Sequence, residues 1–193
     1  MAKLRRGFKT WCENAARGFR RELGLSPFDA LDPFNLAHHL QIPVWSPDDI
    51  PELDAEYVRC LTVTESDCWS ALTMRDGPHS LIIVNSSHQL ARVRNSLAHE
   101  LSHVILRHEP PKMMQALDGA MIMTDYDAVQ EEEASTLGGA LLVPREALLN
   151  HVNGGFSDED AANYFGVSLQ LIRQRKNTTG IGFQLARRGT WRP

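Results

Sequence analysis

The sequence predicts an α+β protein in which a small, mostly antiparallel sheet packs on one amphipathic helix and a pair of helices closes the chain. Three observations predict this class. Between residues 57 and 84, runs rich in Val, Ile, Thr and aromatic residues are separated by turn residues, as in strands. Between 90 and 104, apolar residues recur at spacings of three and four, as in a helix. After residue 157, a capping signal and a Gly turn define two short helical segments.

Two helices and an edge strand are expected before the sheet. Residues 6–23 place apolar and arginine side chains on opposite faces of an amphipathic helix. An Asp-Pro pair starts a second helix over 34–40, because Asp is a good N-cap and Pro suits the first helical position. Residues 42–45 are expected at a sheet edge, since Pro43 cannot donate to a central ladder. A loop is expected over 46–56.

Two or three strands are expected, around residues 57–63, 69–75 and 80–84, and the last two are joined by a turn at Asp76-Gly77-Pro78. Asn85-Ser86-Ser87 offers N-caps for the helix that follows.

The second half of the chain is predicted to be mainly helical. Residues 109–128 show no clear periodicity and are expected to form a loop, which could cover a cleft. A helix over 131–144 ends at a proline that opens the next helix, over 145–151. The closing pair is expected over 158–165 and 169–176.

The bulk composition is that of an ordinary globular protein, with 193 residues, 42% hydrophobic and 23% charged. We expect one domain over residues 1–152, and a C-terminal helix pair with a basic tail over 153–193, packed on that domain. No apolar run approaches the roughly 18 residues of a membrane span, and the basic start has no apolar signal segment. We therefore expect no membrane association and a cytoplasmic location. Three cysteines without a Cys-x-x-Cys pair predict free thiols.

The stretch His99-Glu100-Leu101-Ser102-His103 contains the pattern His-Glu-x-x-His within the central predicted helix. Residues four apart lie on one helical face, so both imidazoles can reach one zinc ion, while Glu100 can contact a water molecule beside it. A chance match on an ordinary core helix is the competing interpretation. A third ligand is needed to decide between the two.

The residues that follow His103 exclude one large class of zinc proteases, the metzincins. Metzincins use a third histidine in HExxHxxGxxH, which requires Gly at 106 and His at 109, but this chain has Leu106 and Glu109. His108 misses by one residue, which turns it about 100° round a helix. The other common solution is a glutamate from a later helix, and Glu131-Glu132-Glu133 supplies candidates.

The two motifs together, HELSH and then an acidic helix that ends in Leu-Leu-Val-Pro, resemble the ImmA/IrrE family of metallopeptidases, whose pattern is close to HELGH followed by ExxAxxFAxxLLMP. The resemblance is close over residues 88–108 and 131–144, and looser over 31–37 and the closing helices. It implies a zincin-like metallopeptidase domain and, by counting back from the proline, places the metal glutamate at Glu131.

The resemblance also bears on several neighbouring residues. Ser135 stands where the family usually has Asn or Asp, and it could orient a ligand histidine less strongly than a carboxylate does. Glu132 and Glu133 are expected to be solvated acids at a helix start. Tyr126 or His108 could stabilise an oxyanion, although a structural role is favoured for both.

The resemblance implies a gluzincin-like zinc endopeptidase in which His99, His103 and Glu131 hold Zn²⁺ and Glu100 is the general base. Its substrate would be a specific protein, often a helix-turn-helix DNA-binding regulator, cut in response to stress or mobile-element signals. An extended substrate could pair with an edge strand of the sheet.

Two alternatives to a peptidase remain open from the sequence. Residues 160–176 resemble a helix-turn-helix with Arg173, Arg175 and Lys176 on the second helix, which would suit a DNA-binding regulator, but a closing helix pair of the peptidase domain is favoured. Residues 161–193 contain six Lys and Arg and no Asp or Glu, a charge balance that would suit a weak nucleic-acid contact through this segment. The third interpretation is a zinc-binding scaffold that sequesters a regulator without cutting it.

Overall fold

The structure, a computed structural model, describes residues 4–109, 112–115, 121–124 and 127–184, with the backbone alone for the two short middle ranges. It confirms the α+β class. A three-stranded sheet has the order β1 (Val44–Trp45), β3 (His79–Val84), β2 (Ala71–Asp76). Strand β1 runs parallel to β3, whereas β2 is antiparallel to it.

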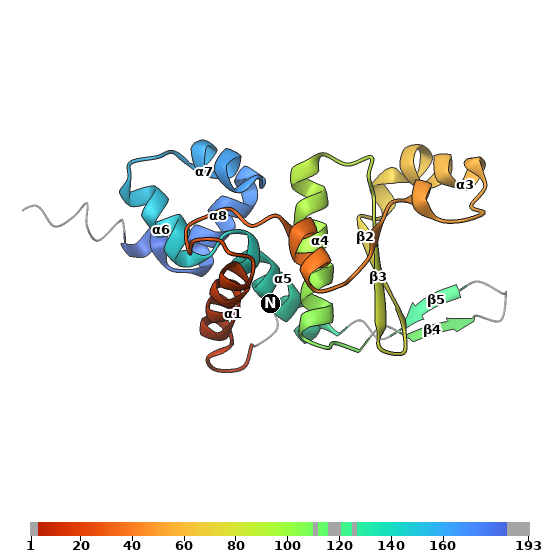
Figure 1. Ribbon diagram of the computed structural model, residues 1–193, viewed down its shortest axis with the longest axis horizontal. Helices are drawn as coiled ribbons and strands as arrows, with labels where there is room; N and C mark the ends of the chain where they lie inside the picture. Colours follow the sequence, from red (N-terminus) through yellow and green to blue (C-terminus); the bar gives the residue numbers. More distant parts are fainter. Residues whose placement is uncertain (1–3, 110–111, 116–120, 125–126, 185–193) are drawn as a thin grey trace, which may run out of the picture.

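Helix α4 (Leu90–Ile105) lies between the sheet and helix α5 (Ala128–Leu142), as Figure 1 shows. Helices α1 (Phe8–Glu22) and α2 (Pro33–His39) complete the main core, α1 against α5 and α2 against α4. As expected, the Asp32 side chain caps α2 by accepting from the backbone of Phe34 at 2.9 Å. The edge strand expected around Pro43 is also present, as β1.

The prediction of a strand over residues 57–63 is wrong. The chain instead forms α3 (Ala55–Arg59) and a wider helical turn over Cys60–Thr64, between the short 3₁₀ turns Pro47–Asp49 and Ser66–Cys68. The half-buried side chains in this stretch include Val58, Leu61 and Thr62, a spacing of three and four, while Tyr57 and Val63 are exposed. Burial thus follows a helical period, which overrides the β-propensity of the individual residues.

Two further expectations need correction. The backbone of residues 109–128 contains an antiparallel pair of strands, β4 (Lys112–Gln115) and β5 (Met121–Thr124), where a loop was expected. Helix α4 begins after Gln89, which provides no side-chain cap. Asn85 is fully buried instead, and its amide donates to the carbonyl groups of Ser66 and Trp69 at 2.8 and 3.3 Å. It therefore ties the loop before β2 to the end of β3.

Close packing between α4 and α5 depends on Gly138. A Cβ atom at this position would lie 3.2 Å from the backbone of Ala98 and 3.3 Å from the backbone nitrogen of His99. Glycine therefore allows the two helices to approach closely at the level of the first histidine of the motif.

Helices α6 (Arg145–Asn153), α7 (Asp158–Phe165) and α8 (Leu169–Thr178) surround a second apolar cluster, which also includes the end of α5. Ser157 and Asp160 form the expected capping box of α7. Gly166 ends this helix in the left-handed conformation, with φ +64°. Among the described residues, no helix is both long and apolar enough to cross a bilayer.

Candidate metal centre

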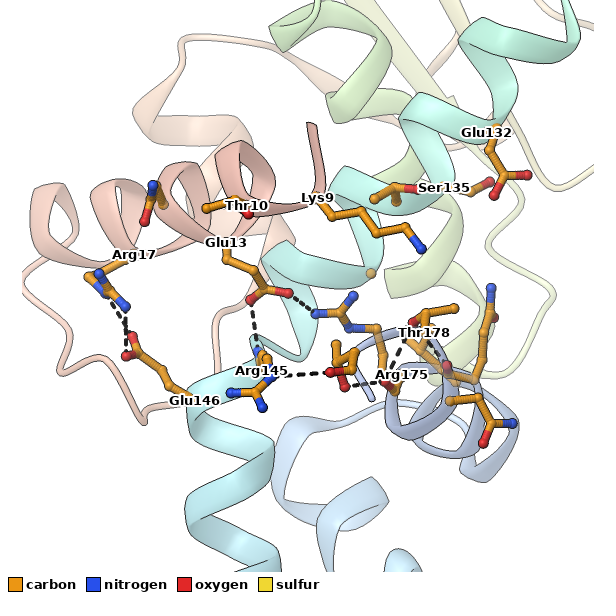
Figure 2. Close-up of a pocket in the computed structure, with 17 residues that line it drawn as sticks. Lys9, Thr10, Glu13, Arg17, Glu132, Ser135, Arg145, Glu146, Arg175 and Thr178 are labelled. Carbon is orange, nitrogen blue, oxygen red and sulfur yellow. Dashed lines mark hydrogen bonds and ion pairs between the residues drawn. The ribbon is translucent and has the colours of Figure 1, made fainter. Parts of the chain in front are cut away.

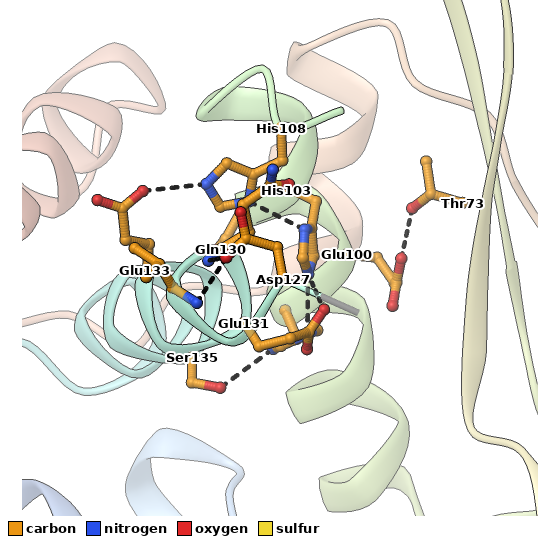
Figure 3. Close-up of polar contacts among 12 residues, drawn as sticks. Thr73, Glu100, His103, His108, Asp127, Gln130, Glu131, Glu133 and Ser135 are labelled. Carbon is orange, nitrogen blue, oxygen red and sulfur yellow. Dashed lines mark hydrogen bonds and ion pairs between the residues drawn. The ribbon is translucent and has the colours of Figure 1, made fainter. Parts of the chain in front are cut away.

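Two histidines and one glutamate converge between α4 and α5 (Figure 3). His99 and His103 lie one turn apart on α4, and their Nε2 atoms are 3.0 Å from each other. Glu131, in the first turn of α5, has one carboxylate oxygen 3.2 Å from Nε2 of His99 and the other 3.5 Å from Nε2 of His103. We call these three side chains the His-His-Glu cluster.

The separations in the cluster suit a metal ion. One ligand atom from each side chain lies within 4.8 Å of the other two. Zinc binds imidazole nitrogen and carboxylate oxygen at about 2.0–2.2 Å, so the ligand atoms of a tetrahedral ion lie roughly 3.4 Å apart. Two imidazoles and one carboxylate form a donor set that fits zinc and leaves a fourth position open.

The environment of His103 favours the neutral imidazole that metal binding requires. Burial lowers the pKa of His103 to about 4, with smaller contributions from its neighbours His99 and His108. The ring is therefore neutral near pH 7, and a neutral imidazole has a lone pair on one of its two nitrogens for a metal ion.

Helix α5 positions Glu131 through its own start. The Asp127 side chain caps the helix by accepting from the backbone nitrogens of Val129 and Gln130 at 2.8 and 3.3 Å. This cap fixes the first turn, which carries Glu131. The contact at Gly138, two turns later, fixes the distance between α5 and the histidine helix.

Glu100 follows His99 on α4 and faces the sheet. The Thr73 hydroxyl on β2 donates to its carboxylate at 2.5 Å (Figure 3). Burial raises the pKa of Glu100, whereas the hydrogen bond from Thr73 acts in the opposite direction. The carboxylate is thus held beside the cluster on the side nearest β2, without being one of its members.

His108 and Glu133 extend the cluster on the other side of His103. Nδ1 of His108 lies 3.0 Å from Nδ1 of His103, and Nε2 of His108 lies 3.2 Å from a carboxylate oxygen of Glu133. The imidazole of His108 is only 6% exposed, and the side chain of Glu133 is 15% exposed. The prediction that Glu133 is a solvated acid is therefore wrong. We call this arrangement the His103–His108–Glu133 chain.

A tight turn at the end of α4 returns His108 toward His103. Arg107 adopts the left-handed conformation with φ +56°, and the backbone nitrogen of His108 donates to the carbonyl of His103 at 3.0 Å. This is a Schellman ending in which a non-glycine residue occupies the left-handed position. Arg75 of β2 reinforces it, because its guanidinium donates to the carbonyls of His103 and His108 at 3.1 and 2.7 Å.

Three further residues were considered from the sequence, namely Ser135, Glu132 and Tyr126. Ser135 is one turn after Glu131, and its hydroxyl lies 3.4 Å from Nδ1 of His99. The sequence predicted that this position could orient one of the two histidines, and in the structure that histidine is His99. Glu132 points away from the cluster and lines a neighbouring cleft. Tyr126 lies outside the described residues.

That cleft, of about 950 Å³, opens between α1, α5 and α8 (Figure 2). Its charged side chains are largely paired with one another. Arg17 and Glu146 form two hydrogen bonds of 2.8 and 2.9 Å, and Glu13 accepts from Arg175 at 2.5 Å. We interpret these ion pairs as structural links between the N-terminal helix and the C-terminal helices.

The family model of the IrrE N-terminal-like domain, peptidase M78, matches the chain over residues 55–177. The chain belongs to the ImmA/IrrE family. The match spans α3 to α8 and includes the His-His-Glu cluster as well as Glu100. Membership indicates a metallopeptidase-type function, and hence a protein substrate. A search of curated proteins found no match.

Sequence reasoning missed the parts played by Thr73, Arg75 and Glu133 around this ImmA/IrrE site. Thr73 and Arg75 lie on a strand far from the motif along the chain, and no local pattern marks them. The position of His108 soon after the motif was a signal for its proximity to the site. The sequence analysis assumed that the helix continues through residue 108, which would point this side chain away from the two motif histidines. The left-handed conformation of Arg107 reverses that direction. Gly or Asn usually marks such a helix end in a sequence, and this chain has neither there.

Proposed function

We propose that this protein is a zinc-dependent endopeptidase in which His99, His103 and Glu131 bind the metal and Glu100 is the general base. The observation that carries the proposal is the joint placement of the His-His-Glu cluster and a separate, partly buried carboxylate, that of Glu100, which is next to His99 on α4. A zinc ion bound there would polarise a peptide carbonyl and lower the pKa of a bound water toward about 7.

The protein's own residues account for the proton transfers. Glu100 takes a proton from the attacking water and later passes it to the leaving amide nitrogen. Its raised pKa suits both steps, because a base closer to neutrality can also return the proton. Thr73 fixes the carboxylate so that one oxygen accepts from the hydroxyl while the other is free to act.

Strand β2 offers a place for an extended substrate. It is an edge strand, and within the described part of the chain β3 is the one strand paired with it. Thr73 lies on this strand and contacts Glu100, so a polypeptide added along the outer edge of β2 would pass beside the cluster. Main-chain pairing of this kind supplies affinity without fixing the sequence of the substrate.

We propose a helix-turn-helix regulator as the substrate on the family resemblance. The alternative, that this chain itself binds DNA through α8, has less support from the side chains. Arg175 is buried against Glu13 and the carbonyl of Val143, and Lys176 pairs with Asp158, whereas Arg173 is exposed. This arrangement favours a closing helix pair over a recognition helix.

Replacing Glu100 by Gln tests the proposal, because the substitution leaves the three ligands in place. The parent protein and E100Q are each loaded with zinc and incubated with a lysate of the source cells, and newly formed protein N-termini are identified by mass spectrometry. A peptidase generates N-termini that E100Q does not, while both proteins bind one zinc ion. Equal sets of N-termini would overturn the proposal, and a regulator held by both proteins but cut by neither would support the scaffold alternative.

A further inference from the structure

The His103–His108–Glu133 chain is connected at both links, has the buried imidazole of His108 at its centre and is not used by the proposed proton transfers. It begins at the Nδ1 atom of a proposed ligand, passes through an imidazole that is 6% exposed and ends at a carboxylate on another helix. Burying such polar groups is costly unless each one is satisfied, so the arrangement calls for a specific role.

The direction of the hydrogen bonds follows from the metal site. Nε2 of His103 faces Glu131 and His99, and a nitrogen that binds a metal carries no proton. The proton of the neutral ring is therefore on Nδ1, and it is donated to Nδ1 of His108 across 3.0 Å. His108 must then carry its own proton on Nε2.

That proton meets an acceptor. A carboxylate oxygen of Glu133 lies 3.2 Å from Nε2 of His108, and an ionised carboxylate can only accept. All the hydrogen bonds thus run one way, from His103 to Glu133. A reversed chain would place a proton on the metal-facing nitrogen of His103, and Glu133 disfavours this because it cannot donate when ionised.

We propose that His108 and Glu133 are positioning residues, which hold the His103 ring in the one tautomer and orientation that bind the metal. The two proposed histidine ligands differ in this respect. Among the residues that the structure describes, the partner of Nδ1 of His99 is the exposed hydroxyl of Ser135, at 3.4 Å. His103 is the proposed ligand that the fold fixes, through the buried His108 and its partner Glu133, the Schellman turn and the two hydrogen bonds from Arg75 to the carbonyls of that turn. This inference rests on the proposed zinc site.

The test measures zinc affinity by competition with a chromophoric chelator, with Glu133→Ala compared with its matched control Glu132→Ala. Both positions lie in the first half of α5, but Glu132 faces the cleft between α1 and α8. Loss of a residue that orients a metal ligand typically lowers affinity about 10–100-fold. We expect a loss in this range for Glu133→Ala and less than about 3-fold for Glu132→Ala, well below that range.

Two substitutions at residue 108 separate orientation from mere packing. His108→Phe keeps a buried ring without an acceptor, whereas His108→Asn places an amide oxygen near the position of Nδ1. We expect His108→Phe to lose zinc affinity to a similar extent as Glu133→Ala, and His108→Asn to recover most of it. Thermal unfolding of the metal-free proteins shows whether each variant is folded. If His108→Phe is not folded, the comparison of Glu133→Ala with Glu132→Ala still tests the proposal.

Nitrogen NMR of the zinc-loaded parent reads the tautomers directly. We expect His108 to carry its proton on Nε2. Unchanged zinc affinity in Glu133→Ala, or a proton on Nδ1 of His108, would overturn the proposal while leaving the zinc site intact. A parent protein that binds no zinc would overturn the site and this role together, which distinguishes the two failures.

Discussion

The hydroxyl of Thr73 and the carboxylate of Glu100 are 2.5 Å apart, and they join the sheet to the motif helix beside the His-His-Glu cluster. This bond lowers the pKa of Glu100, against the larger effect of burial, which raises it. Thr73→Val keeps the shape of the side chain and removes the donor. We therefore expect the pKa of Glu100 to rise further.

Because a general base must be ionised to act, the acidic limb of the pH–rate profile should move to higher pH in Thr73→Val. Activity should fall most at the acidic end of the profile and recover as the pH is raised. The measurement is kcat/KM against pH for a substrate identified from the lysate experiment. Thr73→Ser retains the hydroxyl and is the control, and an acidic limb at the same pH in all three proteins would contradict this role.

Metal removal should destabilise the protein only while the three proposed ligands are present. A metal that binds the folded state alone adds stability by mass action, so a chelator should lower the thermal midpoint of the zinc-loaded parent. His99→Ala and Glu131→Ala should retain no zinc in elemental analysis, and the chelator should leave their midpoints unchanged. Glu132→Ala should behave like the parent. Stoichiometric zinc in Glu131→Ala would point to another third ligand.

Gly138→Ala should destabilise the protein and weaken the metal site at the same time. The new methyl group would lie 3.2 Å from the backbone of Ala98, which cannot move aside as a flexible side chain can. Overpacking of this kind costs about 1–3 kcal/mol of unfolding free energy. Separation of α5 from α4 would also move Glu131 away from His99. Denaturant unfolding and zinc affinity measure the two effects.

Gly18→Ala provides the opposite expectation. Gly18 lies inside α1, and a Cβ atom there would meet nothing within 4 Å. Alanine lowers the entropy lost on forming the helix, so the free energy of unfolding should rise by about 0.5–1 kcal/mol. A gain at residue 18 together with a loss at residue 138 would show that close helix approach, rather than helix propensity, decides the effect of Gly138→Ala.

Cys12 should resist thiol reagents in the folded protein. It is fully buried, and burial, together with the charge of Glu13, raises its pKa to about 12. The reactive thiolate is therefore scarce at pH 8, and the reagent has no access. Mass spectrometry after brief alkylation should find Cys12 unmodified in the native state and modified in denaturant. The raised pKa also means that this thiol contributes stability at neutral pH, which is lost as the pH rises toward 12.

The sequence alone was sufficient where a local rule is strong. Periodic apolar residues predicted α1 and α4, and the Asp-Pro start of α2 and the Ser157 capping box were both correct. Such signals succeed because they depend on residues within one or two turns of each other. The strand expected over 57–63 failed because β-propensity is decided by the neighbours that a strand finds, and this segment buries its apolar side chains on a helical face.

For the proposed site, the sequence determined that His99, Glu100 and His103 share one helix, because of their spacing, and the family resemblance pointed to Glu131 as the third ligand. Only the tertiary structure decided how these side chains meet and what supports them. The left-handed turn at Arg107 brings His108 back to His103, and the pairing of β2 with β3 places Thr73 and Arg75 beside the motif helix. Contacts between residues distant in the chain depend on helix separation and backbone direction, which no local pattern encodes.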